Sequence, residues 1–188
     1  MPRILVIFGT TDGHTARIAS AIGDAVNDGG GTAAVVQATR DGPDPRRYDA
    51  VLVAASVHRG RFQQPVVDWV RTHAPSLNAM PTAFVSVSLG ILQHDPAVQA
   101  EVEAIVTRFL DSTGWRPTAR LGAAGALLYT HYGWLTRLMM RRIAGKAGGD
   151  TDTTRDYVYT DWAVLRHFVD AFVRRVEVNV GVPAHALA

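Results

Sequence analysis

The chain has 188 residues, of which 47% are hydrophobic and 19% charged, a composition typical of one compact globular domain. It contains no cysteine, so disulfides, thiolate metal sites, iron–sulfur clusters and cysteine nucleophiles are excluded. The net charge of +2 makes the chain only mildly basic, and its Lys and Arg residues are too dispersed to predict a nucleic-acid partner.

The first apolar segment, residues 3–8, begins almost at the first residue and is too short for a secretory signal. A continuous apolar run of this length predicts a parallel strand buried on both faces. No apolar run approaches the roughly 18 residues that span a bilayer. We therefore expect a cytoplasmic protein.

Strand-like and helix-like segments alternate along the rest of the chain. Further strands are predicted over 32–37, 50–56, 82–87 and 117–124, and helices over 15–27, 62–73 and 96–111, with a last helix that Asp161 can cap. This alternation predicts an α/β domain of three layers, in which helices cover both faces of a parallel sheet. Five strands fit the doubly wound order 2-1-3-4-5, whose ligands bind at the carboxyl ends of the strands.

The loop Thr10-Thr11-Asp12-Gly13-His14-Thr15 joins the first strand to the first helix. A helix N-terminus has free N–H groups and partial positive charge, threonine hydroxyls can donate further hydrogen bonds, and glycine lets the backbone approach a phosphate closely. The loop has neither a Gly-Lys-Ser/Thr nor a G-x-G-x-x-G pattern, so it predicts neither a Walker A nor a Rossmann grip. The competing interpretation is an ordinary helix cap by Thr11 or Asp12.

An insert over about 127–156 separates the fifth strand from the last helix, where a short connection would suffice. A basic amphipathic helix is predicted over 131–144, with Arg137, Arg141 and Arg142 beside its apolar face. That helix could lie on an anionic membrane, or pack on the domain or on a second copy of the chain. We expect one domain over 1–178 and a flexible tail over 179–188.

The order of several motifs resembles one family. These are T-x-D-G-x-T after the first strand, then Tyr48-Asp49, 54–57 (AASV), 80–87 (MPTAFVSV), 114–117 (GWRP), 148–153 (GGDTDT) and 158–162 (VYTDW). Together they are similar to the flavodoxin-type protoporphyrinogen oxidases, the menaquinone-dependent protoporphyrinogen IX dehydrogenases. The resemblance spans almost the whole chain and includes the insert.

The resemblance implies a flavodoxin-like fold, FMN as cofactor, a porphyrinogen and a quinone as small-molecule partners, peripheral contact with the cytoplasmic membrane face and a role in haem biosynthesis. It implies that Thr10, Thr11, Asp12, Gly13, His14 and Thr15 hold the phosphate. It places Ala55, Ser56 and Val57 on one side of the flavin ring, Ser86, Val87, Ser88 and Leu89 on the other, and Asp152 and Thr153 at the mouth of the site. Residues 90–95 carry no Lys or Arg, and 58–61 read HRGR, so the sequence departs from the family where substrate would meet the flavin.

Flavin supplies the redox chemistry in such a site, so no catalytic dyad is expected. The seven histidines are scattered and form no metal-ligand pattern, so no metal is expected either. The carboxylates of a porphyrinogen need cationic partners, and Arg59, Arg61, Arg137, Arg141 and Arg142 are the candidates. Arginines like these can also form a merely solvated face. Two other functions stay open: an NAD(P)H:quinone reductase and an electron-carrier flavodoxin.

Overall fold

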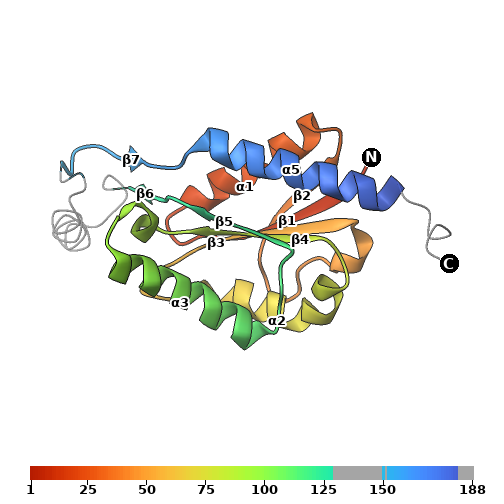
Figure 1. Ribbon diagram of the computed structural model, residues 1–188, viewed down its shortest axis with the longest axis horizontal. Coiled ribbons are helices and arrows are strands. Elements are labelled where there is room, and N and C mark those ends of the chain that lie inside the picture. The colour runs from red at the N-terminus through yellow and green to blue at the C-terminus, as the bar shows by residue number, and fades with distance from the viewer. Residues whose placement is uncertain (129–149, 151, 182–188) are drawn as a thin grey trace.

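The computed structural model describes residues 1–128, 150 and 152–181, the last three by their backbone alone (Figure 1). The described residues form a five-stranded parallel sheet in the order β2-β1-β3-β4-β5, which confirms the predicted topology. The strands are β1 (Arg3–Gly9), β2 (Thr32–Gln37), β3 (Ala50–Ser56), β4 (Thr82–Val87) and β5 (Ala119–Ala123).

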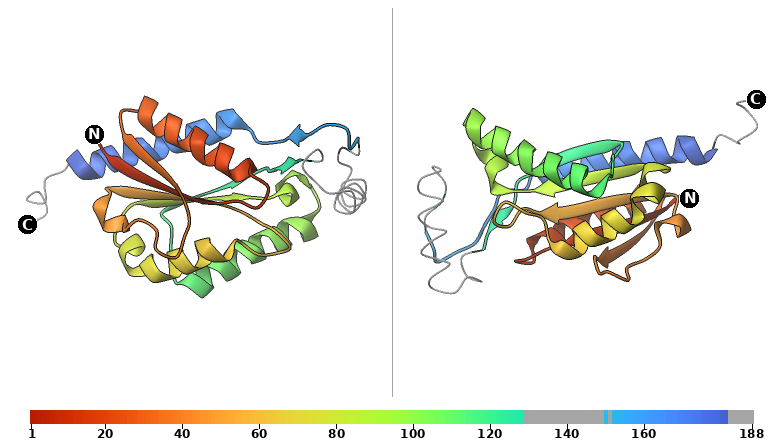
Figure 2. Two further views of the ribbon diagram at one scale, coloured as in Figure 1. Left: turned by 180° about the vertical axis from the view of Figure 1, so that it is seen from behind. Right: turned by 90° about the horizontal axis from the view of Figure 1, so that it is seen from below.

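Helices cover both faces of this sheet, as Figures 1 and 2 show. The helices are α1 (His14–Asp28), α2 (Gln64–Asn78), α3 (Pro96–Thr113) and α5 (Trp162–Gly181). Successive side chains of a strand point to opposite faces, so Ile4 and Val6 pack in the layer of α1 and α5, and Leu5 and Ile7 in the layer of α2 and α3. Burial on both faces explains why β1 is apolar throughout.

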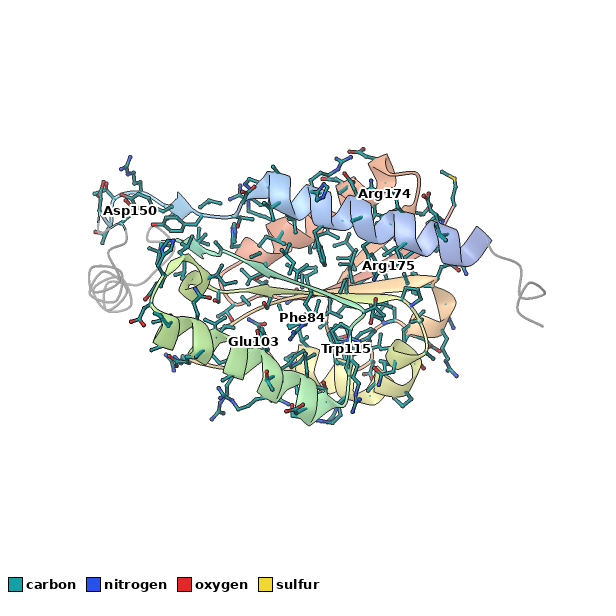
Figure 3. All side chains as sticks on the ribbon, viewed as in Figure 1. Phe84, Glu103, Trp115, Asp150, Arg174 and Arg175 are labelled. Atoms are coloured by element: carbon teal, nitrogen blue, oxygen red, sulfur yellow. The ribbon has the colours of Figure 1, made fainter. Side chains whose placement is uncertain are left out.

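Aromatic side chains fill the layer between the sheet and the helices α2 and α3. Phe84 of β4 and Trp115 lie close together there (Figure 3), with ring centroids 5.6 Å apart in an edge-to-face arrangement. The indole nitrogen of Trp115 donates to the hydroxyl of Thr82, so the burial of this ring leaves no unpaired N–H.

The predicted end of α2 at His73 was wrong, because the helix continues through Pro75 to Asn78. Ala74 and Leu77 continue its buried face, and this burial outweighs the hydrogen bond that a proline cannot donate. The edge strand β5 is shorter than predicted, since it begins at Ala119 rather than at residue 117.

Two short strands, β6 (Ala126–Leu127) and β7 (Tyr157–Val158), pair antiparallel beyond the carboxyl ends of the sheet (Figure 1). We call residues 124–127 and 157–160 the neck, because they bring together the two ends of the insert. The predicted helix over 131–144 lies outside the described residues. The helix α5 extends to Gly181, so the first three residues of the predicted tail are helical. Within the described part of the chain, no helix is long and apolar enough to span a membrane.

Candidate functional site

The register of the sheet brings four strand ends to one level. Gly9 pairs with Ala55, Ser56 with Val87, and Val87 with Ala123. The ladder continues one step into the loops, where the N–H of Val57 donates to the carbonyl of Val87. The loops that follow β1, β3 and β4 therefore meet at one edge of the sheet, where ligands of doubly wound sheets bind. We call this place the loop edge.

The loop after β1 presents backbone N–H groups at the start of α1. Gly13 precedes the helix with φ +88°, a left-handed conformation that favours glycine, and its N–H donates to Thr10 Oγ1 over 2.9 Å. Among the described residues, no side chain caps this helix, and its first turn holds no acidic residue. This finding contradicts the helix cap by Thr11 or Asp12 and leaves the helix end able to bind an anion.

Gln63 links two of the loops. Its side-chain amide donates to Thr11 Oγ1 over 3.1 Å and to Ser56 Oγ over 2.9 Å. Within the described residues, these two hydroxyls and that of Thr10 act as acceptors and donate to no other group. Each therefore still has a hydrogen to donate to a ligand. No motif in the sequence indicated Gln63. The feature that could have indicated it is a polar residue just before the helix whose first turn contains Pro65.

The loops pack closely around Gly9. A Cβ built on this glycine would lie 2.3 Å from Val66 Cγ2 and 2.9 Å from Gln63 Oε1. Two buried polar atoms at this edge, Gln63 Oε1 and Ser88 Oγ, have no hydrogen-bond partner among the described residues. Unpaired buried acceptors and donors are costly, so a polar ligand that bonds to them would stabilise the site.

The residues predicted to flank the flavin ring differ in their solvent exposure. Ala55 and Val87 are buried in the two cores, so they face this edge with backbone rather than side chain. Ser56, Val57 and Leu89 are partly exposed. Leu89 opens the short 3-10 helix η2 (Leu89–Leu92), which follows β4. Thr15 is buried and Thr11 is exposed, so the six residues of the phosphate loop are not equally accessible.

A tight turn presents two of the candidate arginines. His58 and Arg61 exchange backbone hydrogen bonds of 2.8 and 3.2 Å around Arg59 and Gly60, which both have positive φ. Arg59 is thus held in a left-handed conformation that is strained for a non-glycine residue. Both arginines are exposed and make no ion pair with a described residue.

A cleft of about 250 Å³ lies beside this turn, between α2 and α3. Arg61 and Arg108 both line it, and Phe62 and Phe109 contribute apolar walls. Arg108 was not among the predicted site residues, because its helical position gives no sign in the sequence that it lies beside Arg61. A cleft that holds two cationic side chains and two aromatic ones suits an apolar ligand that carries carboxylates.

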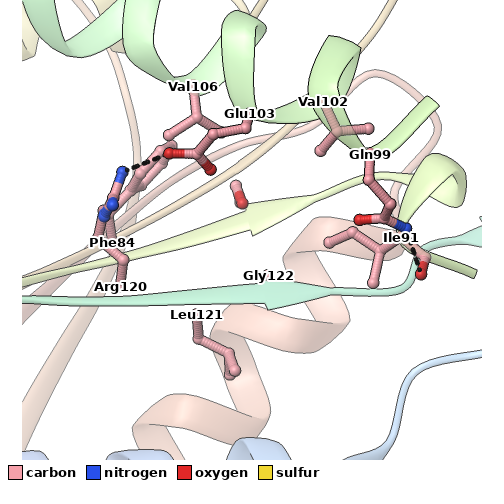
Figure 4. A pocket seen from close by; sticks show the side chains of 10 residues that line it. Phe84, Ile91, Gln99, Val102, Glu103, Val106, Arg120, Leu121 and Gly122 are labelled. Atoms are coloured by element: carbon pink, nitrogen blue, oxygen red, sulfur yellow. Dashed lines mark hydrogen bonds and ion pairs between the residues drawn. The ribbon is translucent and has the colours of Figure 1, made fainter. Parts of the chain in front are cut away.

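A second groove, of about 560 Å³, lies between α3 and the strands β4 and β5 (Figure 4). At one end Arg120 binds Glu103 over 3.1 Å, and at the other Gln99 donates to the carbonyls of Gly90 and Ile91. Ser86 lines this groove, so its side chain lies beneath the loop edge rather than on it. Arg120 already has a carboxylate partner, which makes it a weaker candidate for substrate than Arg61.

The remaining candidates belong to the insert between β5 and α5. Asp152 accepts hydrogen bonds from the N–H and hydroxyl of Thr154 over 3.0 and 2.7 Å, and these bonds lower its pKa. Its neighbour Asp150 lies beyond β7, on the side away from the sheet (Figure 3). Asp152 is exposed and Thr153 half-buried, and their place at the mouth of the flavin site stays a prediction. Arg137, Arg141 and Arg142 lie outside the described residues.

Known proteins share this architecture. A family model of the flavodoxin domain matches residues 5–154. Protoporphyrinogen IX dehydrogenase (quinone) of Escherichia coli strain K12 is 35% identical over 167 residues, which are 88% of this chain and 92% of that protein. The Leishmania major protein of the same name is 35% identical over 173 residues, covering 91% and 74% of the two chains.

Solved flavodoxins share the fold at low identity. An archaeal flavodoxin superposes with a TM-score of 0.53 at 14% identity, covering 93% of this chain and 99% of its own. The flavodoxin of Streptococcus pneumoniae TIGR4 gives 0.55 at 15% identity, covering 94% and 99%. The family match over most of the sequence, with relatives of 35% identity, shows that the chain belongs to the flavodoxin-domain family, in the group that contains the protoporphyrinogen IX dehydrogenases.

Proposed function

We infer that this protein is an FMN-dependent oxidoreductase that converts protoporphyrinogen IX to protoporphyrin IX and passes the electrons to a quinone, as a step of haem biosynthesis. The observation that carries this inference is the loop edge. An uncapped helix end, three hydroxyls free to donate and two orphaned buried polar atoms meet there. Relatives named for this reaction match most of the chain.

The residues of the loop edge fit FMN. The N-terminus of α1, with the hydroxyls of Thr10, Thr11 and Ser56, would bind the phosphate without a lysine. Val57 and Leu89 would lie on either side of the ring system. Bound FMN supplies the two-electron chemistry that links porphyrinogen to quinone, while the protein supplies binding and orientation.

The arginines beside the loop edge would bind the porphyrinogen. Its two propionates are anionic at neutral pH, and Arg59, Arg61 and Arg108 are exposed cations without a described partner. Six electrons and six protons leave the substrate in all, so three quinones become quinols in three successive cycles. The arginines would hold one substrate molecule in place while it is oxidised.

The direct experiment is anaerobic porphyrinogen oxidation by the FMN-loaded protein with menaquinone as acceptor. We expect porphyrin to form with three equivalents of quinol. Rapid flavin bleaching by NADPH alone would instead identify an NAD(P)H:quinone reductase. Reduction by neither donor, with electron exchange only between proteins, would identify a carrier flavodoxin.

Variants test the arginines separately. Arg61→Ala should raise the KM for porphyrinogen about tenfold, which corresponds to the loss of one charge-assisted hydrogen bond of about 1.5 kcal/mol, with FMN affinity unchanged. Arg174 lies on α5 (Figure 3), in the layer opposite the cleft between α2 and α3, so it is the matched control, and Arg174→Ala should leave KM unchanged. An unchanged KM in Arg61→Ala would remove this residue from the substrate site.

Peripheral membrane contact at the cytoplasmic face would bring a lipid-soluble menaquinone to the flavin. Exposed large apolar side chains occur on several described segments, among them Leu92 of η2, Val158 of β7, and Trp162 and Val164 at the start of α5. Sedimentation with anionic vesicles tests the contact. Binding at low salt is expected, and its absence there would contradict a membrane role.

A further inference from the structure

His14 stands in the phosphate loop, but its side chain is turned into the protein. It is the first residue of α1 and only 6% exposed. Its Nε2 lies 2.7 Å from Thr160 Oγ1, across 146 residues of sequence. Its other ring nitrogen, Nδ1, is buried and has no hydrogen-bond partner among the described residues. A phosphate at the loop therefore cannot reach either nitrogen without moving the ring.

The neighbours of His14 fix which nitrogen carries the proton. Thr160 Oγ1 lies 2.7 Å from the carbonyl oxygen of Ala124, which can only accept. A hydroxyl has one hydrogen, so Thr160 donates it to Ala124 and must accept from His14. Nε2 of His14 is therefore the protonated nitrogen, and in the neutral ring Nδ1 carries a lone pair.

This chain of hydrogen bonds ends in both segments of the neck. Ala124 precedes β6 and Thr160 follows β7, and the N–H of Tyr159 donates to the carbonyl of Gly125 over 3.1 Å. The ring of Trp162, at the start of α5, meets the His14 ring edge-on at 6.1 Å. One imidazole thus connects the first turn of α1 to the neck and to α5.

We propose that His14 is a positioning residue, whose side chain ties the phosphate loop to the neck through Thr160 rather than binding the phosphate itself. The role rests on the proposed binding of FMN. The tie holds the first turn of α1 against the neck, so the N–H groups of the loop are already in place when the ligand arrives. Such preorganisation raises affinity because less order is lost on binding.

Burial keeps the ring neutral. The pKa of His14 is lowered, chiefly by desolvation and then by the nearby charge of Arg17 on α1. Asp161, which precedes α5, accepts from the N–H groups of residues 163 and 164, and Asp12 is exposed on the loop. From the described neck, Ala124 and Thr160 contribute only a carbonyl and a hydroxyl to the ring. At neutral pH the imidazole therefore acts as a fixed donor.

Titrations with FMN and with riboflavin, which lacks the phosphate, test this role. His14→Ala and Thr160→Val should each weaken FMN binding about five- to tenfold, the effect of one lost hydrogen bond, and leave riboflavin binding unchanged. The two changes together should weaken it no more than either alone, since they remove the same tie. His14→Gln and Thr160→Ser keep a donor and a hydroxyl, so both should bind FMN nearly as the wild type does.

Nitrogen-15 NMR of the wild-type imidazole supplies a measurement that needs no variant to fold. We expect the neutral tautomer protonated at Nε2. The opposite tautomer would overturn the proposal, and so would variants that bind FMN as tightly as the wild type or that weaken FMN and riboflavin alike. Wild-type protein that fails to bind FMN would instead overturn the proposed function, and the positioning role with it.

Discussion

Gly9 shows how little room a single residue of the loop edge has. The Cβ of an alanine there would overlap Val66 and push against Gln63, which links two loops. We expect Gly9→Ala to lower the free energy of unfolding by about 1–3 kcal/mol, because overpacking forces side chains out of their preferred positions. Gly125→Ala is the matched control, since its Cβ would make an ordinary contact at 3.5 Å. Equal urea midpoints for the two variants would contradict this account of Gly9.

Histidine burial predicts a pH dependence of stability. Burial holds the pKa of His14 in the folded protein below its usual value of about 6.5, so near that pH the unfolded chain binds more protons than the folded chain. Stability should therefore decrease from pH 7.5 to pH 5.5. His14→Gln should flatten that decrease but not abolish it, because burial lowers the pKa of His73 in the same direction. Urea unfolding at the two pH values measures both slopes, and identical slopes would contradict the prediction.

Individual residues also mark where sequence reasoning reached its limit. The motif around Gly13 could be read from the sequence, because a helix N-terminus after a buried strand follows from local pattern. Gln63 and Arg108 could not, since their roles depend on which loops and helices become neighbours in space. The strained φ of Arg59 was likewise invisible, because its turn is fixed by the backbone bonds between His58 and Arg61.

At the scale of elements, the N-terminus of α5 depends on one cap. Asp161 Oδ1 accepts from the N–H groups of Ala163 and Val164, both over 3.0 Å. Asp161→Ala should cost about 1 kcal/mol of unfolding free energy, and Asp161→Asn much less, because asparagine is also a good cap. Chemical denaturation of the two variants compares them directly. If alanine and asparagine had equal effects, capping would not be the source of the stability.

Elements were predictable where their pattern was strong. The ranges 32–37, 50–56 and 82–87 are strands as predicted, because each apolar run is bounded by turn residues. The end of α2 was missed, because tertiary burial of Leu77 overrides the local signal of Pro75. The pairing of β6 with β7 joins segments about thirty residues apart and has no local signal in such short strands.

At the scale of the whole molecule, the order of the strands decides where chemistry takes place. The alternation of strands and helices allowed the sheet order, and hence the ligand-binding edge, to be predicted before any contact was known. The exact partners at that edge were not predictable, because the sequence departs from the family pattern at 58–61 and 90–95. These stretches carry the turn of Arg59 and the helix η2, which shape the surface that substrate would meet.

The central claim is that the loop after β1 binds the phosphate of FMN, and a calorimetric comparison of FMN with riboflavin tests it most directly. Several charge-assisted hydrogen bonds to the phosphate should make FMN bind at least about a hundredfold more tightly, a difference of about 2.7 kcal/mol, with one FMN per chain. Equal affinities for the two flavins, or no binding of either, would contradict the account.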